Sequence, residues 1–167
     1  VVVVAGSYYV AMADPAGHYP IGYYSASGLQ SDPGNATKVA VAAADVSGIN
    51  LKYAAPIYLS GKVTAPGGAG IAGITVIADA SYGTNGATTI IDGTWSIPVL
   101  AGSYLLSYSD DSDTYAPGYY SNTGYQWDRA NATPVAVTTA NVPNLNAQLP
   151  LSVHISGTIT GPGDVPM

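Results

Sequence analysis

The sequence predicts an all-β fold built from tandem β-sandwich repeats with a period of 96 residues. Residues 1–71 align with residues 97–167 without a gap, and 28 of the aligned positions are identical. Short stretches alternate apolar and polar side chains with a period of two, which is the pattern of a half-buried strand. Gly and Pro, with 20 and 12 residues, separate these stretches as they do in sandwiches and barrels. No stretch has apolar residues at helical spacing, so helices are not expected.

Turn-forming residues divide the complete repeat into short strands. Gly and Pro at 66–68 and the polar residues at 81–83 and 85–86 are typical of turns. The pair Asp92-Gly93 is a strong hairpin signal. The strands expected between such signals lie at 57–64, 73–79, 88–91, 94–97, 103–109, 134–139, 145–149 and 153–160.

The repeat divides the chain into three parts. Residues 1–55 are expected to form the C-terminal part of a first sandwich repeat, 56–151 a complete repeat, and 152–167 the first strand of a further repeat. The simplest interpretation is a window on a longer tandem array. A second is a subunit whose open ends are completed by neighbours through strand addition. In either case, the segments expected to pair with another unit are 1–12 and 153–163.

The composition excludes several classes of protein. The net charge is −6 and the basic residues, Lys and Arg together numbering 4, are scattered, so the clustered basic surface that binds nucleic acid is absent. No run of 18 apolar residues exists, so no membrane span is expected. The chain has no cysteine, and 8% of its residues are charged. Sparse charge with abundant Tyr, Asn, Ser and Thr favours an extracellular or cell-surface location.

Four motifs lie in the complete repeat: Ser-Gly-Lys-Val-Thr at 60–64, Gly-Ile-Thr-Val at 73–76, Asp-Gly-Thr-Trp-Ser-Ile at 92–97 and Leu-Ala-Gly-Ser-Tyr at 100–104. Together they resemble the carboxypeptidase regulatory-like repeat, which belongs with the transthyretin-like and collagen-adhesin B-type sandwiches. The resemblance implies an Ig-like/transthyretin-like sandwich that serves as a spacer, a surface array or an accessory module beside a secreted enzyme.

The same resemblance raises two finer points. The segments 115–120 and 132–137 look like the longer bacterial and archaeal version of the repeat. Collagen-adhesin B-type domains often carry a Lys–Asn isopeptide bond, for which Lys62 with Asn144 or Asn146 would be the candidates. Against this cross-link, Thr158 stands in the other copy where Lys62 stands in the first, and the chain contains no Glu.

No catalytic residue, metal ligand or cofactor is expected. His18 and His154 occupy different places in the repeat, and neither has a partner at metal-ligand spacing. The acidic cluster 110–113 would suit Ca²⁺ but lacks the spacing of a calcium loop, so a solvated turn is the favoured interpretation. The chain has no Gly-x-Ser-x-Gly nucleophile motif. An enzyme is therefore not expected.

Two kinds of residue are candidates for modification or contact. Asn35 and Asn131 each begin an Asn-Ala-Thr sequon in a loop, so both are glycosylation candidates. The tyrosines that lie near Pro and Gly in the segments 19–24 and 115–120 form the second set. A Tyr side chain suits a contact surface because its ring is apolar and its hydroxyl group is polar. Tyr115 is expected to fold onto its own sandwich, whereas contact with a neighbour stays open for Tyr119 and Tyr120. The complete set of contact candidates is Tyr19, Tyr23, Tyr24, Tyr115, Tyr119 and Tyr120.

These observations predict a non-catalytic extracellular structural protein. Its tandem repeats would build a cell-surface filament, stalk or array through self-association or strand exchange, which covers open sheet edges. Its partners would be other copies of itself, with glycans as a further class. The alternative is a carbohydrate- or substrate-binding accessory module of a secreted hydrolase, because rows of aromatic side chains also bind sugar rings.

Overall fold

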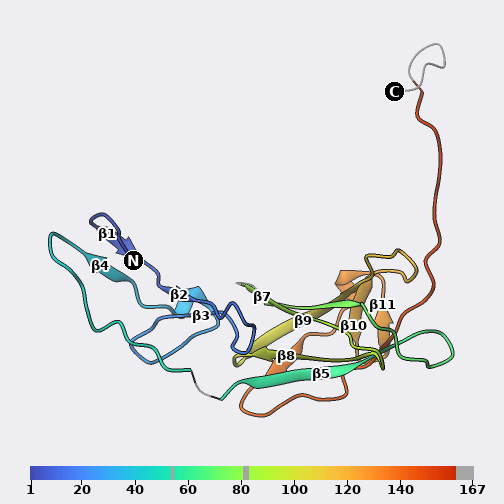
Figure 1. Ribbon diagram of the computed structural model, residues 1–167, viewed down its shortest axis with the longest axis horizontal. Coiled ribbons are helices and arrows are strands. Elements are labelled where there is room, and N and C mark those ends of the chain that lie inside the picture. Colours follow the sequence, from blue (N-terminus) through green and yellow to red (C-terminus); the bar gives the residue numbers. More distant parts are fainter. Residues whose placement is uncertain (54, 81–82, 161–167) are drawn as a thin grey trace.

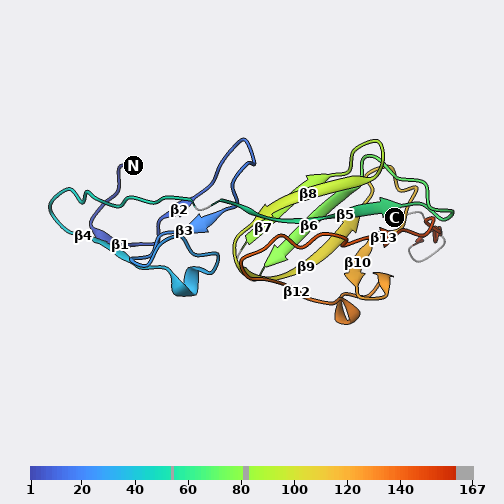
Figure 2. The same cartoon turned by 90° about the horizontal axis from the view of Figure 1, so that it is seen from below.

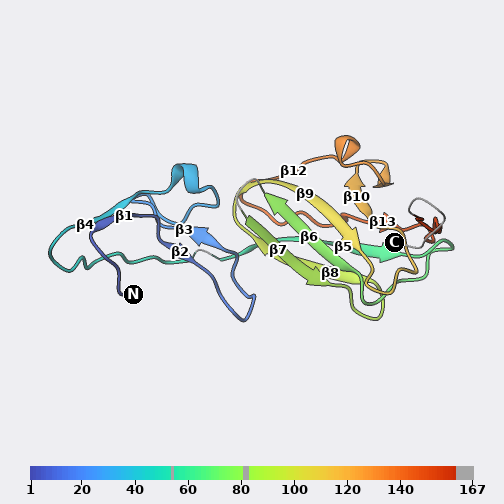
Figure 3. The same cartoon turned by 90° about the horizontal axis from the view of Figure 1, so that it is seen from above.

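The computed structural model describes residues 1–53, 55–80 and 83–160. Almost all regular structure in these residues is β, as the sequence predicts. The elements form two lobes along one long axis (Figure 1). We call residues 1–53 the small lobe and residues 57–151 the large lobe. Figure 2 and Figure 3 show β1 and β4 at one end of the molecule and the dark red tail, residues 152–160, leaving the other end.

Two sheets form the large lobe. The larger has the strand order β11-β10-β9-β6-β7, and β12 pairs with the beginning of β9. The smaller has the order β13-β5-β8, in which β13 runs parallel to β5 and β8 runs antiparallel to it. The strands are β5 Ile57–Thr64, β6 Thr75–Ala80, β7 Gly83–Thr88, β8 Thr94–Val99, β9 Gly102–Ser109, β10 Gly118–Ser121, β11 Gly124–Gln126, β12 Val135–Val137 and β13 Ala147–Gln148.

One hydrophobic core joins the two sheets. Leu59 of β5 and Ile97 of β8 are fully buried, and so are Val76 and Leu106 of the other sheet. Successive side chains of a strand point to opposite faces, so every second residue of these strands reaches the core. The large lobe is therefore sandwich-like. Its buried apolar residues are Leu59, Val63, Ile71, Ile74, Val76, Ala78, Trp95, Ile97, Val99, Tyr104, Leu106, Tyr108, Val135, Val137, Leu145, Ala147 and Leu149.

The small lobe contains two short antiparallel pairs and one turn of 3₁₀ helix. β1 (Gly6–Tyr8) pairs with β4 (Val39–Val41), and β2 (Ala11–Met12) pairs with β3 (Gly22–Tyr23). The 3₁₀ helix η1 (Pro33–Asn35) precedes β4. In the large lobe the 3₁₀ helix η2 (Arg129–Asn131) precedes β12 in the same way.

Many contacts inside the small lobe recur inside the large lobe. The residues that form the second contact lie 96 positions later in the chain than those that form the first. Tyr8 pairs with Val39 in the small lobe, and Tyr104 pairs with Val135 in the large lobe. Several hydrogen bonds of the small lobe also have an equivalent 96 positions later in the large lobe. The shared ones are Tyr8 Oη to the Val4 carbonyl with Tyr104 Oη to the Leu100 carbonyl, Thr37 N to the Tyr24 carbonyl with Thr133 N to the Tyr120 carbonyl, and Ala26 N to Thr37 Oγ1 with Asn122 N to Thr133 Oγ1.

Burial is where the lobes differ. Tyr104, Leu106 and Tyr108 of β9 are buried, because β5 and β8 of the other sheet supply the opposite side of the core. The matching residues of the small lobe are only half-buried, and so are the matches of five further core residues. These half-buried residues are Tyr8, Val10, Met12, Val39, Val41, Ile49, Leu51 and Tyr53.

The predicted turn at 85–86 is wrong. Asn85 and Gly86 lie inside β7, where Gly86 pairs with Ile77 of β6. A Cβ atom at Gly86 would lie 2.8 Å from the Cδ1 atom of Ile77. Glycine is therefore used here for a close approach between neighbouring strands, which is a known use of glycine within sheets.

The predicted strand at 88–91 is also wrong beyond Thr88. Ile90 and Ile91 are exposed and lie outside any strand. The turn that contains Asp92 and Gly93 is present, since Gly93 N donates to the Ile90 carbonyl at 2.8 Å. It connects β7 to β8, however, and these strands belong to different sheets. The turn therefore crosses the sandwich and forms no hairpin.

The other expected strands agree with the structure in kind, with bounds that differ by a few residues. The exception is the tail, residues 152–160. Leu151 bridges to Tyr115, and residues 152–159 lie in no strand. Of the segment 153–163 expected to pair with another unit, residues 161–163 lie outside the described part of the chain. The division at 55 and 151 stays a prediction.

Candidate functional site

The segment 115–120 of the large lobe, which contains Tyr115, Tyr119 and Tyr120, places its three rings in different environments. Tyr119 and Tyr120 are neighbours on β10, so their side chains point to opposite faces of the sheet. Tyr120 packs against the core, and so does Tyr115 from the preceding loop. Tyr119 faces Arg129, whose guanidinium carbon lies 5.9 Å from the centre of the ring. Of these three rings, Tyr119 is therefore the one that lies on the face away from the core.

Arg129 links this ring to the middle of the larger sheet. Its Nη2 atom donates to the Oδ2 atom of Asp79 on β6 at 2.8 Å. The hydrogen bond to Asp79, followed by one to Tyr119, raises the pKa of Arg129 above its ordinary value. Arg129 therefore stays protonated. Its hydrogen bond to Asp79 keeps the guanidinium group next to the Tyr119 ring.

The tyrosines of the small lobe contact their own lobe. The rings of Tyr19 and Tyr53 are 4.8 Å apart and inclined at 36°. Tyr23 and Tyr24 are half-buried, and Tyr24 N donates to the Val10 carbonyl at 2.8 Å. Tyr19 is exposed, whereas its counterpart Tyr115 packs against the core. Of the three tyrosines, Tyr19 is thus the one that is more exposed than its counterpart 96 positions later.

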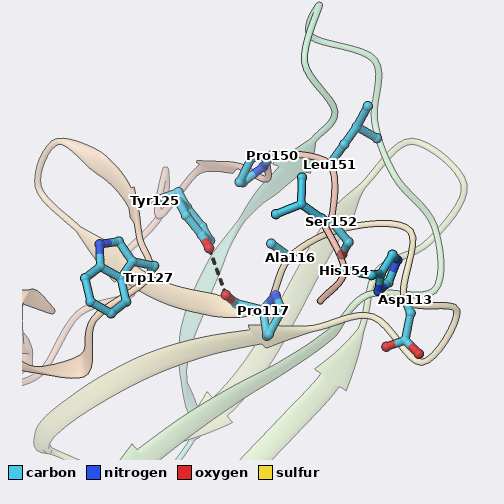
Figure 4. Close-up of a pocket in the computed structure, with 10 residues that line it drawn as sticks. Asp113, Ala116, Pro117, Tyr125, Trp127, Pro150, Leu151, Ser152 and His154 are labelled. Atoms are coloured by element: carbon cyan, nitrogen blue, oxygen red, sulfur yellow. Dashed lines mark hydrogen bonds between the residues drawn. The ribbon is translucent and has the colours of Figure 1, made fainter. Parts of the chain in front are cut away.

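An open depression lies beside the start of the tail (Figure 4). Its volume is about 510 Å³. The Tyr125 hydroxyl donates to the Pro117 carbonyl at 2.8 Å, and the indole of Trp127 is 76% exposed nearby. Apolar rings with a carboxylate at the rim suit a sugar or an apolar side chain. The lining residues are Asp113, Ala116, Pro117, Tyr125, Trp127, Pro150, Leu151, Ser152, Val153 and His154.

Trp127 was not among the residues predicted to form a contact. The signal that could have identified it is the difference between copies, since Ser31 stands 96 positions earlier. The change from a small polar residue to an exposed Trp is thus the largest difference in side-chain size at this place between the two aligned segments. His154 and Asp113 line the same depression from the tail and from the 110–113 loop.

The acidic cluster 110–113 is a hydrogen-bonded loop. The Asp110 carboxylate accepts the backbone amides of Ser112, Thr114 and Tyr115 at 3.0 Å each. Burial opposes the charged form, but these hydrogen bonds outweigh it and lower the pKa of Asp110. Asp14 accepts the amides of the matching small-lobe residues in the same way. Each carboxylate thus stabilises its own loop by accepting backbone hydrogen bonds.

The histidines lie apart from any set of metal ligands. His18 is exposed, and its Nδ1 atom is 3.7 Å from Asp14 Oδ2. His154 is exposed in the tail. Within residues 1–53, 55–80 and 83–160, no group of three His, Asp or Glu side chains is arranged to hold a metal ion.

The two sequons occupy equivalent places. Asn35 and Asn131 are the last residues of η1 and η2, and both are exposed. Asp32 and Asp128 cap these short helices by accepting the amides of Gly34 and Ala130. Both asparagines are thus at the surface of the molecule.

The asparagines considered for an isopeptide cross-link lie in the segment that follows the edge of β5. Asn146 Oδ1 accepts the Lys62 backbone amide at 2.9 Å, and Asn141 Oδ1 accepts the Tyr58 amide at 2.9 Å. Asn144 has a left-handed backbone with φ of 65°. Two asparagine side chains therefore replace backbone carbonyls where the segment 141–149 follows β5.

No protein-family model and no curated protein matches the chain. In the described part of the chain, no helix has the length and apolar character needed to cross a membrane.

Proposed function

We propose that the chain is a non-catalytic extracellular structural protein whose tandem sandwich repeats, 96 residues apart, associate into a filament, stalk or surface array. The observation that carries the proposal is the difference in burial between matching residues. Apolar positions that are buried in the large lobe are half-buried in the small lobe, and Val153, Ile155 and Ile159 of the tail are exposed. Apolar side chains left open at both ends of the molecule are surface that association with further copies would bury.

Two further observations support the repeat and its location. Contacts and capping residues recur at the same spacing of 96 positions in both lobes. Both sequons lie on the exposed ends of short helices, as an extracellular glycoprotein would require.

Electron microscopy of the purified chain tests the structural role. Regular fibres or linear arrays are the expected result, with a mass that rises with concentration in sedimentation experiments. An isolated monomer at every concentration, with both terminal segments disordered, would contradict the self-associating role. Mass spectrometry of peptides that contain Asn35 and Asn131, from the native source, tests the glycans.

A carbohydrate-binding module is the second candidate, and the depression with Trp127 and Asp113 favours it. Titration calorimetry of the chain with oligosaccharides tests this alternative. Binding that Trp127→Ala abolishes and Tyr9→Ala leaves unchanged would support it, since Tyr9 is an exposed tyrosine of the other lobe. Dispersed particles without sugar affinity would contradict both candidates.

A further inference from the structure

We propose that residues 153–160 of one chain add as a parallel strand to residues 45–53 of a second copy. The proposal rests on the self-association proposed above, and it specifies the two segments and their register. Addition of a strand to an open edge is a common mode of protein recognition, in which main-chain hydrogen bonds supply affinity and side-chain positions supply specificity.

The large lobe contains the same contact within one chain. There, β5 runs beside residues 141–149, with Leu59 bridged to Val142 and Val63 paired with Ala147, both parallel. The connecting hydrogen bonds are Val142 N to the Tyr58 carbonyl, Ser60 N to the Val142 carbonyl, Leu145 N to the Ser60 carbonyl, Leu149 N to the Thr64 carbonyl, Tyr58 N to Asn141 Oδ1 and Lys62 N to Asn146 Oδ1, all between 2.9 and 3.1 Å.

The small lobe carries the accepting half of this contact. Val46 and Asn50 are identical to Val142 and Asn146, which lie 96 positions later. Asp45 keeps a side-chain oxygen at the place of Asn141. Gly48, with φ of 81°, has the left-handed backbone that Asn144 has with φ of 65°. The segment 45–53 therefore has both the acceptors and the kink that residues 141–149 use to follow β5.

The tail carries the donating half. It repeats the Ser60-Gly61 step of β5 as Ser156-Gly157, and Thr160 stands where β5 has Thr64. Ile155 and Ile159 stand at the places of Leu59 and Val63, the two β5 residues that are fully buried. In the tail these two side chains are 102% and 76% exposed. The inferred register sets Ile155 against Val46 and Ile159 against Leu51.

The two segments of one chain lie at different ends of the molecule. Residues 45–53 run along the small lobe into β5, whereas the tail leaves the far end of the large lobe (Figure 2). The contact is therefore between chains and joins the tail of one copy to the head of the next. A head-to-tail contact does not pair a surface with itself, so it generates rings or open filaments rather than closed dimers.

A glycine provides a specific test. A Cβ atom at Gly61 would overlap the Leu145 carbonyl, so β5 can follow its neighbour only with glycine there. Gly157 occupies the matching place in the tail, and a Cβ atom there would meet nothing within 4 Å. A larger residue at Gly157 leaves the isolated chain undisturbed and collides with the Ile49 carbonyl once the tail has paired.

Cysteine cross-linking measures the contact directly, because the chain has no cysteine of its own. Chains with Val46→Cys are mixed with chains carrying Ile155→Cys, and disulfide-linked pairs are followed under mild oxidation. The control replaces Ile155→Cys by Thr158→Cys, which is three residues out of register and on the other strand face. Since a disulfide requires Cα atoms less than about 7 Å apart, the first pair should cross-link at least tenfold faster.

Adding Gly157→Val to the Ile155→Cys chain should reduce the cross-linking rate at least tenfold. Thr158→Lys, which restores the residue that β5 has at this place, should leave the rate unchanged. Equal rates for the two cysteine pairs, or no effect of Gly157→Val, would overturn the inferred contact. If fibres still form in that case, self-association by another surface stands. If the unmodified chain stays monomeric and no pair cross-links, both the contact and the self-association are contradicted.

Discussion

Two core tyrosines of β9 differ in how their hydroxyl groups are satisfied. The Tyr104 hydroxyl donates to the Leu100 carbonyl at 2.9 Å. The Tyr108 hydroxyl is buried and has no hydrogen-bond partner among the described residues. A buried polar group without a partner costs free energy, whereas a paired one contributes modestly to stability. The chain contains no Phe, so Tyr fills core places that do not use its hydroxyl.

Tyr108→Phe should therefore stabilise the large lobe, and Tyr104→Phe should destabilise it. The expected change in the free energy of unfolding is about 1 kcal/mol in each case, with opposite signs. Denaturant unfolding followed by circular dichroism measures both. Destabilisation by Tyr108→Phe as large as that by Tyr104→Phe would show that the Tyr108 hydroxyl has a partner in solution.

The same tyrosines predict a loss of stability at alkaline pH. Burial raises the pKa of Tyr108 well above its ordinary value near 10, and the nearby Tyr120 adds to this shift. Burial also raises the pKa of Tyr104, although its hydrogen bond to Leu100 opposes the shift. A neutral acid with a raised pKa contributes stability below its unfolded-state pKa and loses it as the pH rises further.

The denaturant midpoint should thus be level from pH 8 to about 10 and fall above it. Tyr108→Phe should make the fall shallower, because one buried phenol no longer resists ionisation. Tyr9→Phe, at an exposed position, is the matched control and should leave the slope as it is. An unchanged slope in Tyr108→Phe would contradict the assignment of the alkaline loss to this residue.

At the scale of elements, the packing of β5 depends on Gly61, whereas the tail, residues 152–160, has no close neighbour at the matching Gly157. Gly61 passes close to the Leu145 backbone in the large lobe, while Gly157 stands in open space. Gly61→Ala should lower the free energy of unfolding by about 1–3 kcal/mol through overpacking. Gly157→Ala should change it by less than about 0.5 kcal/mol. Thermal unfolding of the two variants, each with one added methyl group, checks the difference; equal effects would contradict the close approach at Gly61.

The strands whose inward residues alternate clearly could be predicted from the sequence. β5 and β9 are the best examples, because Leu59 and Val63, like Tyr104, Leu106 and Tyr108, follow the period of two. β7 could not be predicted, since it pairs with β6 through residues that are typical of turns. Its Asn85-Gly86 step is a strand because Gly86 lies against Ile77, and this contact depends on tertiary structure.

The positions of the candidate contact tyrosines could be predicted from the sequence. Which of their rings point toward the core and which point away from it could not. The repeat pointed to the tyrosine positions, yet the inward or outward direction of each ring depends on the register of β10 with β9. That register turns Tyr120 to the core and Tyr119 to Arg129. The pairing of Arg129 with Asp79, 50 residues apart, leaves no local pattern in the sequence.

At the scale of the whole molecule, the two lobes combine equivalent hydrogen bonds with unequal burial. Thr37 N donates to the Tyr24 carbonyl at 2.9 Å, and Thr133 N donates to the Tyr120 carbonyl at 3.0 Å. The small lobe has no equivalent of β5, β6 and β8 packed on it within residues 1–53. Regions with fewer buried apolar contacts open more readily, so equivalent hydrogen bonds are not equally protected.

Amide hydrogen exchange should therefore be at least about tenfold faster at Thr37 than at Thr133 in the dilute chain. Raising the chain concentration should then slow exchange at Val46, Ile49 and Tyr53, whose amides would donate to the tail of a second copy. The Gly157→Val chain is the control, because it keeps the dilute pattern and should show no such slowing. If the amides of 45–53 gain no protection while fibres form, the association uses another face of the molecule. If they gain protection in the wild-type chain alone, the small lobe is stabilised by strand addition from its neighbour.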